Sequence, residues 1–193
     1  MTLTLIAAAT LAGCVQGDDA SGPTPTPSRS ASASPSAPTA TATPSATPTA
    51  APEPEVIPFS SGCESLIDPD TMYAFDPNFS LIGSFTPDGG SLAAEVATAG
   101  GTVCRWVHGT NAVTIDVAVA DLPADVAASR RATLDAAGAS VGDYGDRGYF
   151  SAAGGAGQAQ AFPSHYWVTI VSPIFSAPGD ASVLMGDVVA ALP

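Results

Sequence analysis

The clearest alternation of apolar and polar positions in the chain runs over residues 112–120. Val113, Ile115, Val117 and Val119 share one face of this segment, and Thr114, Asp116 and Ala118 share the other. Because side chains alternate between the two faces of a strand, the pattern predicts a β-strand with one face in the core. A turn at Gly109–Asn111 separates it from an earlier predicted strand over Thr102–His108.

Helix signals surround these strands. Asp68 followed by Pro69 combines an N-cap with a proline at the first helical position, and so predicts a short helix through Phe75. Boundary prolines, glycines and capping residues predict three more helices, over Ser91–Ala99, Pro123–Ala137 and Asp180–Leu192. Helical spacing in the last one predicts four buried residues, Val183, Leu184, Val188 and Leu192.

Three short strand segments follow the third predicted helix, over Tyr149–Ala153, Gly157–Phe162 and His165–Val171. Glycine and proline turns separate them, as in an antiparallel meander. Helices that flank two groups of strands are typical of the α+β class. We therefore expect one α+β domain over residues 58–193, a mostly antiparallel sheet with helices packed on one face.

Residues 23–55 show no such periodicity and consist almost wholly of Pro, Thr, Ser and Ala. Such a segment has too little apolar surface to offset the entropy lost on ordering. We expect residues 14–57 to form a disordered linker, a stalk that carries the domain through cell-wall material. A proline-rich recognition ligand is the alternative.

The chain opens with an apolar run, Leu3–Ala9, that is too short to span a bilayer but suits a signal peptide. It ends in Leu11-Ala12-Gly13-Cys14, which resembles a bacterial lipobox, where the cysteine receives a diacylglyceryl group before cleavage. We expect removal of residues 1–13 and acylation of Cys14; a buried N-terminal helix is the alternative. No basic residue precedes the run, which indicates a start farther upstream or a trimmed chain.

Eighteen acidic residues and five arginines, with no lysine, give the chain a formal charge of −13. We expect no nucleic-acid partner, because neutralising phosphates needs clustered cations and the only basic cluster is Arg130–Arg131. The charge predicts solubility at a crowded surface, with attraction for cations or basic ligands as the alternative.

The chain contains three cysteines, of which one belongs to the lipobox and two to the predicted domain. With Cys14 assigned to the lipid anchor, Cys63 and Cys104 remain as an even pair in an exported domain, where a disulfide is favoured. The bridge would close a loop of roughly 40 residues and stabilise the fold by roughly 4 kcal/mol. Two buried free thiols are the alternative. Neither cysteine has a second Cys or His at ligand spacing, so we expect no metal site and no cofactor.

Gly138–Gly142 matches the Gly-x-Ser-x-Gly string of hydrolases, and His165 follows it in the right order. That motif needs a strand before Ser140 and a helix after it, whereas here a helix precedes and a turn follows. We interpret it as a helix C-cap and loop, and we expect no catalytic residues. His108 and His165 are the only histidines, and turn or surface positions are favoured over a pH switch or a metal role.

Aromatic residues gather in the predicted strands: Trp106, Tyr149, Phe150, Phe162, Tyr166 and Trp167. Because Tyr166 and Trp167 are neighbours, they must point to opposite faces of the sheet, and we expect at least one to be exposed or to line a cleft. Core packing explains most of these residues. The alternative is an apolar pocket between sheet and helices, with Trp106, Tyr166 and Trp167 in its wall.

Several features together resemble the small lipoproteins of actinobacteria whose domain is of unknown function. They are the lipobox, the Ser/Thr/Pro stalk, Gly62–Leu66, Gly101–Trp106, and Gly142-Asp143 with Gly148–Phe150. The resemblance implies an α+β domain on the outer face of the plasma membrane, a disulfide between Cys63 and Cys104, and no catalytic residues.

We therefore expect a lipid-anchored extracytoplasmic protein of the cell envelope whose domain is a non-catalytic binding or interaction module. Its partners would be the membrane, through the anchor, and an envelope protein or small ligand. The alternative is a lipoprotein that carries a small solute or lipid in an apolar pocket.

Overall fold

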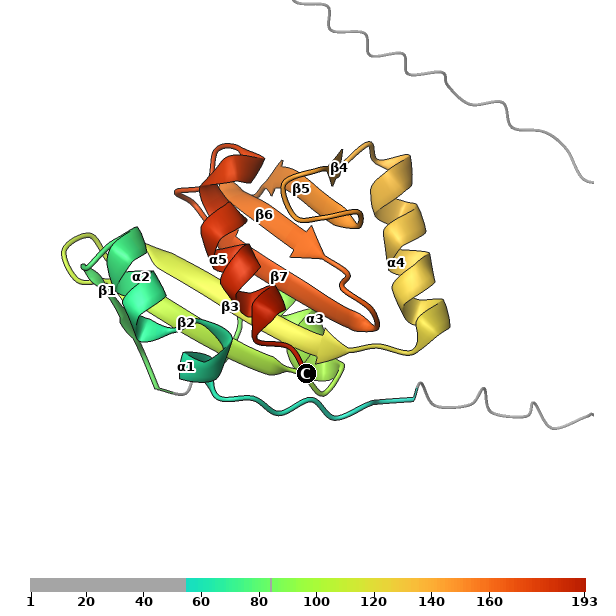
Figure 1. The fold of residues 1–193 in the computed structure, drawn as a ribbon, viewed down its shortest axis with the longest axis horizontal. Coiled ribbons are helices and arrows are strands. Elements are labelled where there is room, and N and C mark those ends of the chain that lie inside the picture. The colour runs from blue at the N-terminus through green and yellow to red at the C-terminus, as the bar shows by residue number, and fades with distance from the viewer. Residues whose placement is uncertain (1–54, 84) are drawn as a thin grey trace, which may run out of the picture. The chain divides into compact units, whose positions relative to one another are not determined.

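A seven-stranded sheet lies at the centre of the computed structural model, which describes residues 55–83 and 85–193 (Figure 1). The strand order is β1-β2-β3-β7-β6-β5-β4, and all neighbouring pairs are antiparallel. The strands are β1 (Phe79–Leu81), β2 (Thr102–His108), β3 (Thr114–Asp121), β4 (Ser140–Val141), β5 (Gly148–Ala153), β6 (Ala156–Ala161) and β7 (Tyr166–Ser172). The α+β class with a mostly antiparallel sheet is therefore confirmed.

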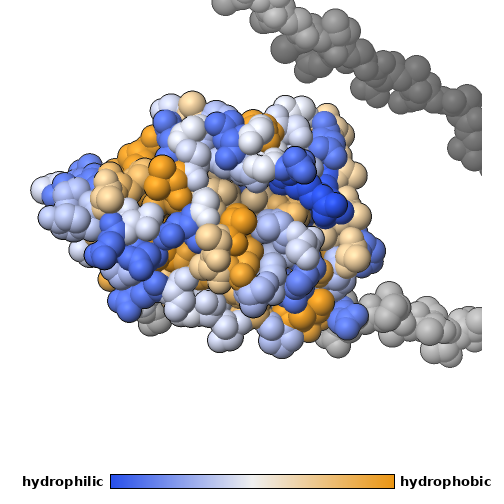
Figure 2. Space-filling model, in the orientation of Figure 1, coloured by the Kyte–Doolittle hydropathy of each residue, from blue (hydrophilic) through white to orange (hydrophobic). Residues whose placement is uncertain are grey.

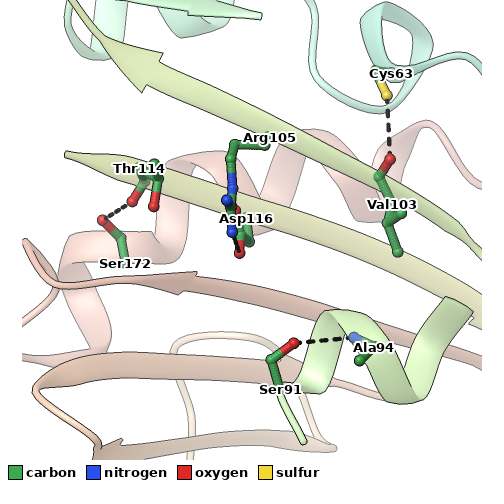
Figure 3. Close-up of polar contacts among 8 residues, drawn as sticks. All are labelled: Cys63, Ser91, Ala94, Val103, Arg105, Thr114, Asp116 and Ser172. Atoms are coloured by element: carbon green, nitrogen blue, oxygen red, sulfur yellow. Dashed lines mark hydrogen bonds and ion pairs between the residues drawn. The ribbon is translucent and has the colours of Figure 1, made fainter. Parts of the chain in front are cut away.

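The helices are α1 (Cys63–Leu66), α2 (Pro69–Phe75), α3 (Leu92–Thr98), α4 (Ala124–Ala136) and α5 (Pro178–Ala190). None of them is long and apolar enough to cross a membrane. The Asp68 carboxylate caps α2 by accepting a hydrogen bond from the Asp70 amide at 2.7 Å. Ser91 caps α3 in the same way, with its hydroxyl 3.1 Å from the Ala94 amide nitrogen (Figure 3). Both helices follow the boundaries that the sequence predicts.

Helices cover both faces of the sheet, so the expectation that they pack on one face is wrong. On one face, Ile115, Val117 and Val119 of β3 join a core with α1, α2 and α5. On the other, Ala118 and Ala120 pack against α3. Figure 1 shows α5 in front of the sheet and α3 behind it. Alanine allows a helix to approach closely, but it occurs on both buried and exposed faces of strands. The alternation of apolar and polar residues in β3 therefore indicates only one buried face.

The last helix begins two residues earlier than predicted, at Pro178. Asp180 is therefore not the N-cap: it lies in the first turn, and its carboxylate accepts from the amides of Ser176 and Ala177 at 2.7 and 2.9 Å. The buried positions are Ala181, Leu184, Met185 and Val188, an i, i+3, i+4, i+7 stripe. Val183 was predicted to be buried and is 61% exposed. Figure 2 shows that apolar patches interrupt the polar surface of this face.

A disulfide between Cys63 and Cys104 ties α1 to β2, as the sequence predicts. The Cα atoms lie 5.7 Å apart, within the usual range for a bridge. The Cys63 sulfur also lies 3.8 Å from the Val103 carbonyl oxygen (Figure 3), a contact without a hydrogen bond because a bridged sulfur carries no proton. The segment before α1 is thereby held against the sheet.

Two polar links join the central strands (Figure 3). Arg105 of β2 and Asp116 of β3 are register partners and form a bidentate ion pair, with N···O distances of 2.6 and 2.7 Å. The hydrogen bond to Asp116 raises the pKa of Arg105. At the far end of β7, the Ser172 hydroxyl donates to the Thr114 carbonyl at 2.7 Å. Both links fix the register of β3 with its neighbours.

Several expectations concern residues outside the described part: the signal peptide, the acylated Cys14 and nearly all of the linker. Ile57, the last residue of the expected linker, pairs with Asp121 in an antiparallel bridge. The Phe59 amide then donates to the Gly100 carbonyl at 3.0 Å. The chain thus joins the fold along the junction of α3 and β2.

Gly101 allows the close approach of α3 to β3, and Gly101→Ala should destabilise the fold. A Cβ there would collide with the Val119 carbonyl oxygen and lie 2.6 Å from Val96 Cγ1. We expect a loss of about 1–3 kcal/mol in the free energy of unfolding, measured by urea titration. The matched control is Gly186→Ala in α5, where a Cβ meets nothing within 4 Å and should stabilise the helix. Equal effects of the two substitutions would contradict this account of the α3 contact.

Candidate functional site

An aromatic row lies on the α3 face of the sheet and forms the base of the candidate site. Trp167 of β7 and the ring of Phe162 are stacked, with centroids 6.4 Å apart and planes at 13°. Phe162 in turn meets Tyr149 of β5 edge to face, at 5.7 Å and 85°. All three belong to one core cluster. The row therefore runs across neighbouring strands as a continuous aromatic surface that something must cover.

Helix α4 covers this row with apolar residues, Val126, Ala127 and Leu134, and with charged side chains. The guanidinium carbon of Arg130 lies 3.8 Å from the centroid of the Trp167 ring, and that of Arg131 lies 5.8 Å from Phe162. Burial, followed by a hydrogen bond with Asp135, raises the pKa of Tyr149. Each ring of the aromatic row thus meets a charged residue of α4. Only Ala127 of this helix is fully buried.

Arg130 is the residue on which the site converges. Its Nη1 donates to Glu95 Oε2 of α3 at 2.7 Å, and its Nε is buried with no partner among the described residues. The two side chains are 32% and 42% exposed, which makes this a half-buried ion pair between the helices. A guanidinium carries five N–H donors in a planar fork, so one contact to Glu95 uses only part of its capacity.

Gln160 of β6 provides a buried polar group at the base of the same groove. The residue is 6% exposed, and its Oε1 accepts from Trp167 Nε1 at 3.0 Å. This hydrogen bond fixes the orientation of the side-chain amide and leaves its NH₂ group for the cavity that Gln160 lines. Both buried polar groups at the base of the site are therefore donors.

Three cavities of about 190, 360 and 170 Å³ lie along the groove between α3 and α4. Each of them is lined by both Glu95 and Arg130. The smallest reaches Glu55 and Val56 at the start of the described chain. We call this set of cavities the α3–α4 groove. It combines an ion pair with apolar walls, which include Leu92 and Leu134.

The residues proposed to line an apolar pocket lie in the core instead. Trp106 is 4% exposed and packs with α1, α2 and α5, whereas Trp167 is fully buried on the opposite face. Tyr166 is 8% exposed and packs edge to face on Phe59. Tyr166 and Trp167 do point to opposite faces, as predicted. Neither side chain is exposed, and neither lines the cavities of the α3–α4 groove, because helices cover both faces.

A larger cavity, of about 420 Å³, lies between α5 and the loop before β5. Tyr144 borders it; burial raises the pKa of its hydroxyl, which donates to the Pro178 carbonyl at 2.5 Å. Asp146, Arg147 and Ser164 form the rest of its polar rim, and all three are exposed. This cavity holds no buried polar side chain that is free to meet a ligand, and we therefore place the candidate site in the α3–α4 groove.

Ser140 and His165 of the hydrolase-like motif do not come together into a catalytic site. Ser140 lies in β4, three strands from β7 and so about 14 Å away across the sheet. His165 Nδ1 lies 3.0 Å from the hydroxyl of Ser164, and its Nε2 lies 3.6 Å from Asp121. The His165 side chain is half exposed on a turn. His108 lies at the other end of the sheet, 3.4 Å from Asp76.

Within the described residues, no group of three or more His, Cys, Asp or Glu side chains is arranged to hold a metal ion. Comparisons of the chain with family models, with curated proteins and with solved structures found no match. The site is therefore interpreted from its own geometry.

Replacing Arg130 should loosen α4 more than replacing its neighbour Arg131. Arg130→Gln removes a partly desolvated cation–π contact and the pair with Glu95, and we expect it to lower the free energy of unfolding by about 1–2 kcal/mol. Arg131→Gln makes the same change of charge at a longer aromatic contact, and we expect a loss below about 1 kcal/mol. Urea unfolding followed by circular dichroism measures both. An equal or reversed order would show that the Trp167 contact does not hold the helix.

Proposed function

We propose that this protein is a lipid-anchored, extracytoplasmic binding module of the cell envelope, and that its ligand occupies the α3–α4 groove. The observation that carries the proposal is the pair of donors at the base of the groove, Arg130 and Gln160. Natural binding sites combine apolar walls with a few fixed polar groups, and this groove has both.

The charge distribution supports the choice of this face. Residues 58–193 contain fourteen acidic residues and four arginines. Arg105 is locked to Asp116 on β2 and β3. Arg130 and Arg131 lie over the aromatic row, and the charge of Arg147 acts on Tyr149 in the same row. Two of the four arginines, Arg130 and Arg131, therefore lie over one aromatic row of an otherwise acidic domain, where their charge favours an anionic partner.

A non-catalytic role fits the polar groups of the groove. In the 190 Å³ cavity they comprise an arginine, a glutamate paired to it, an amide and the Thr133 hydroxyl, and Arg130 and Glu95 already neutralise each other. General acid–base or nucleophilic catalysis needs a group poised to gain or lose a proton or to attack. These residues are suited to binding and orienting a ligand.

The lipid-carrying alternative draws less support from the fold. Its pocket was expected around Trp106, Tyr166 and Trp167, which instead fill two cores on opposite faces of the sheet. The cavities of the α3–α4 groove are too small for a pair of acyl chains, since the largest has a volume of about 360 Å³. A small ligand suits it better.

A fragment screen on the isotope-labelled full-length chain tests the site. We expect the amide shifts caused by bound fragments to cluster on α3 and α4. Thr133→Trp should abolish them, because Thr133 lines the 190 Å³ cavity and a tryptophan there fills it. Ala132→Trp on the exposed side of α4 is the matched control and should leave binding unchanged. Shifts that cluster elsewhere, or that survive Thr133→Trp, contradict the proposed site.

The anchor is tested at Cys14, which lies outside the described residues. Two or more acyl chains on this cysteine would hold the protein stably on a membrane. We expect Cys14→Ser to lose incorporation of labelled palmitate and to leave the membrane fraction. Cys63→Ser is the matched control, since it removes a cysteine of the disulfide and should keep the label. A Cys14→Ser protein that stays labelled and membrane-bound contradicts the anchor.

A further inference from the structure

The geometry points to a carboxylate with a short apolar tail as the ligand of the α3–α4 groove, bound to Arg130 in place of Glu95. This inference rests on the proposed function and names the chemical class of its ligand. The carboxylate would be the end group of a small organic acid or of a peptide, since both present the same head group.

The ion pair of the groove already shows which chemistry fits there. Glu95 Oε2 lies 2.7 Å from Arg130 Nη1, so a carboxylate is accepted at the guanidinium in this setting. Arg130 and Glu95 share one hydrogen bond, between Nη1 and Oε2, whereas a guanidinium binds carboxylates best in a two-point fork. Since Glu95 is 42% exposed on a surface helix, it can turn outward into water when a ligand replaces it. Glu95 therefore acts as a built-in competitor.

The remaining donors favour an acceptor ligand over a cation or a neutral donor. Arg130 Nε is buried without a partner among the described residues, which leaves an unsatisfied N–H at the site. Gln160, 6% exposed, lines the same 190 Å³ cavity, and because its Oε1 accepts from Trp167, its NH₂ is the group left to donate to a ligand. The stacking of Arg130 on Trp167 holds the guanidinium plane in place, so the fork is pre-organised before the ligand arrives.

The apolar walls define the rest of the ligand. Leu92 of α3 and Leu134 of α4 line the 190 Å³ cavity beside Arg130, and both are half-buried. A cavity of this size lies below the usual range for drug-sized ligands, so the tail must be short. A carboxylate bound to Arg130 would place its first few carbons between these leucines.

Hexanoate is the test probe, added to the full-length chain and followed by amide and side-chain shifts. We expect binding in the millimolar range, with the largest shifts at Arg130 Nε–H and Trp167 Nε1–H. Glu95→Gln should tighten binding at least threefold, because it removes the competing carboxylate. Arg130→Gln should weaken binding at least tenfold, whereas Arg131→Gln, the matched control for charge, should change it less than twofold. Hexanamide has the same tail without the charge and should bind at least tenfold more weakly.

Each contrary result has a definite meaning. Equal binding of hexanamide, or no gain in Glu95→Gln, overturns the carboxylate class. If hexanoate fails to bind while other fragments occupy the groove, the ligand class is wrong and the proposed function stands. If no fragment of any charge binds in the groove, the proposed function itself fails. The peptide acetyl-Ala-Leu and its C-terminal amide complete the set: tighter binding of the free peptide acid than of hexanoate assigns the carboxylate to a peptide end, and the reverse order assigns it to a free acid.

Discussion

The burial of β3 and β7 on both faces is the constraint on which the rest of the fold depends. These two strands are neighbours at the centre of the sheet, and nearly every residue of β7 is buried. One face receives α5 and the two short helices that precede β1. The other face needs its own cover, and that requirement explains both the small residues beneath α3 and the charged residues on α4.

The two helices on that second face solve the problem differently. Helix α3 packs tightly, because Gly101, Ala118 and Ala120 offer no bulk against it. Helix α4 approaches the sheet less closely, and much of its cover comes from Arg130 over Trp167 and Arg131 over Phe162. A guanidinium can lie flat on an aromatic ring and still present donors at its edges. The cover is therefore also the polar element of a groove.

Much of the fold could be predicted because the signals were local. The strand Thr102–His108 and the helix Pro69–Phe75 have the predicted bounds, since alternation and capping act over a few residues. The second buried face could not be predicted, because Ala118 and Ala120 satisfy either environment. The prediction that Val183 is buried was wrong for another reason. Helix α5 contains many apolar residues, so its sequence fits more than one buried stripe, and the structure buries Ala181, Leu184, Met185 and Val188.

The sequence indicated single residues of the candidate site but not their arrangement. Arg130 stood out in the basic pair Arg130–Arg131, and Trp167 stood out as an aromatic in a strand. Their contact joins α4 to β7, two elements that are separated in the chain by three strands, and no local sequence pattern indicates that they meet. Glu95 and Gln160 carried no signal of their own. An arginine at a core-facing position of a helix is the one sequence feature that could have indicated the site.

Hydrogen exchange along α4 in the full-length protein shows how firmly this helix is held on the sheet, since α4 buries only Ala127 fully and meets the aromatic row through Arg130 and Arg131. We expect α4 amides to exchange through local opening, well before those of β7 and α5, and Arg130→Gln to accelerate exchange in α4 alone. Exchange of α4 together with β7 in one global step, unchanged by Arg130→Gln, would contradict this expectation.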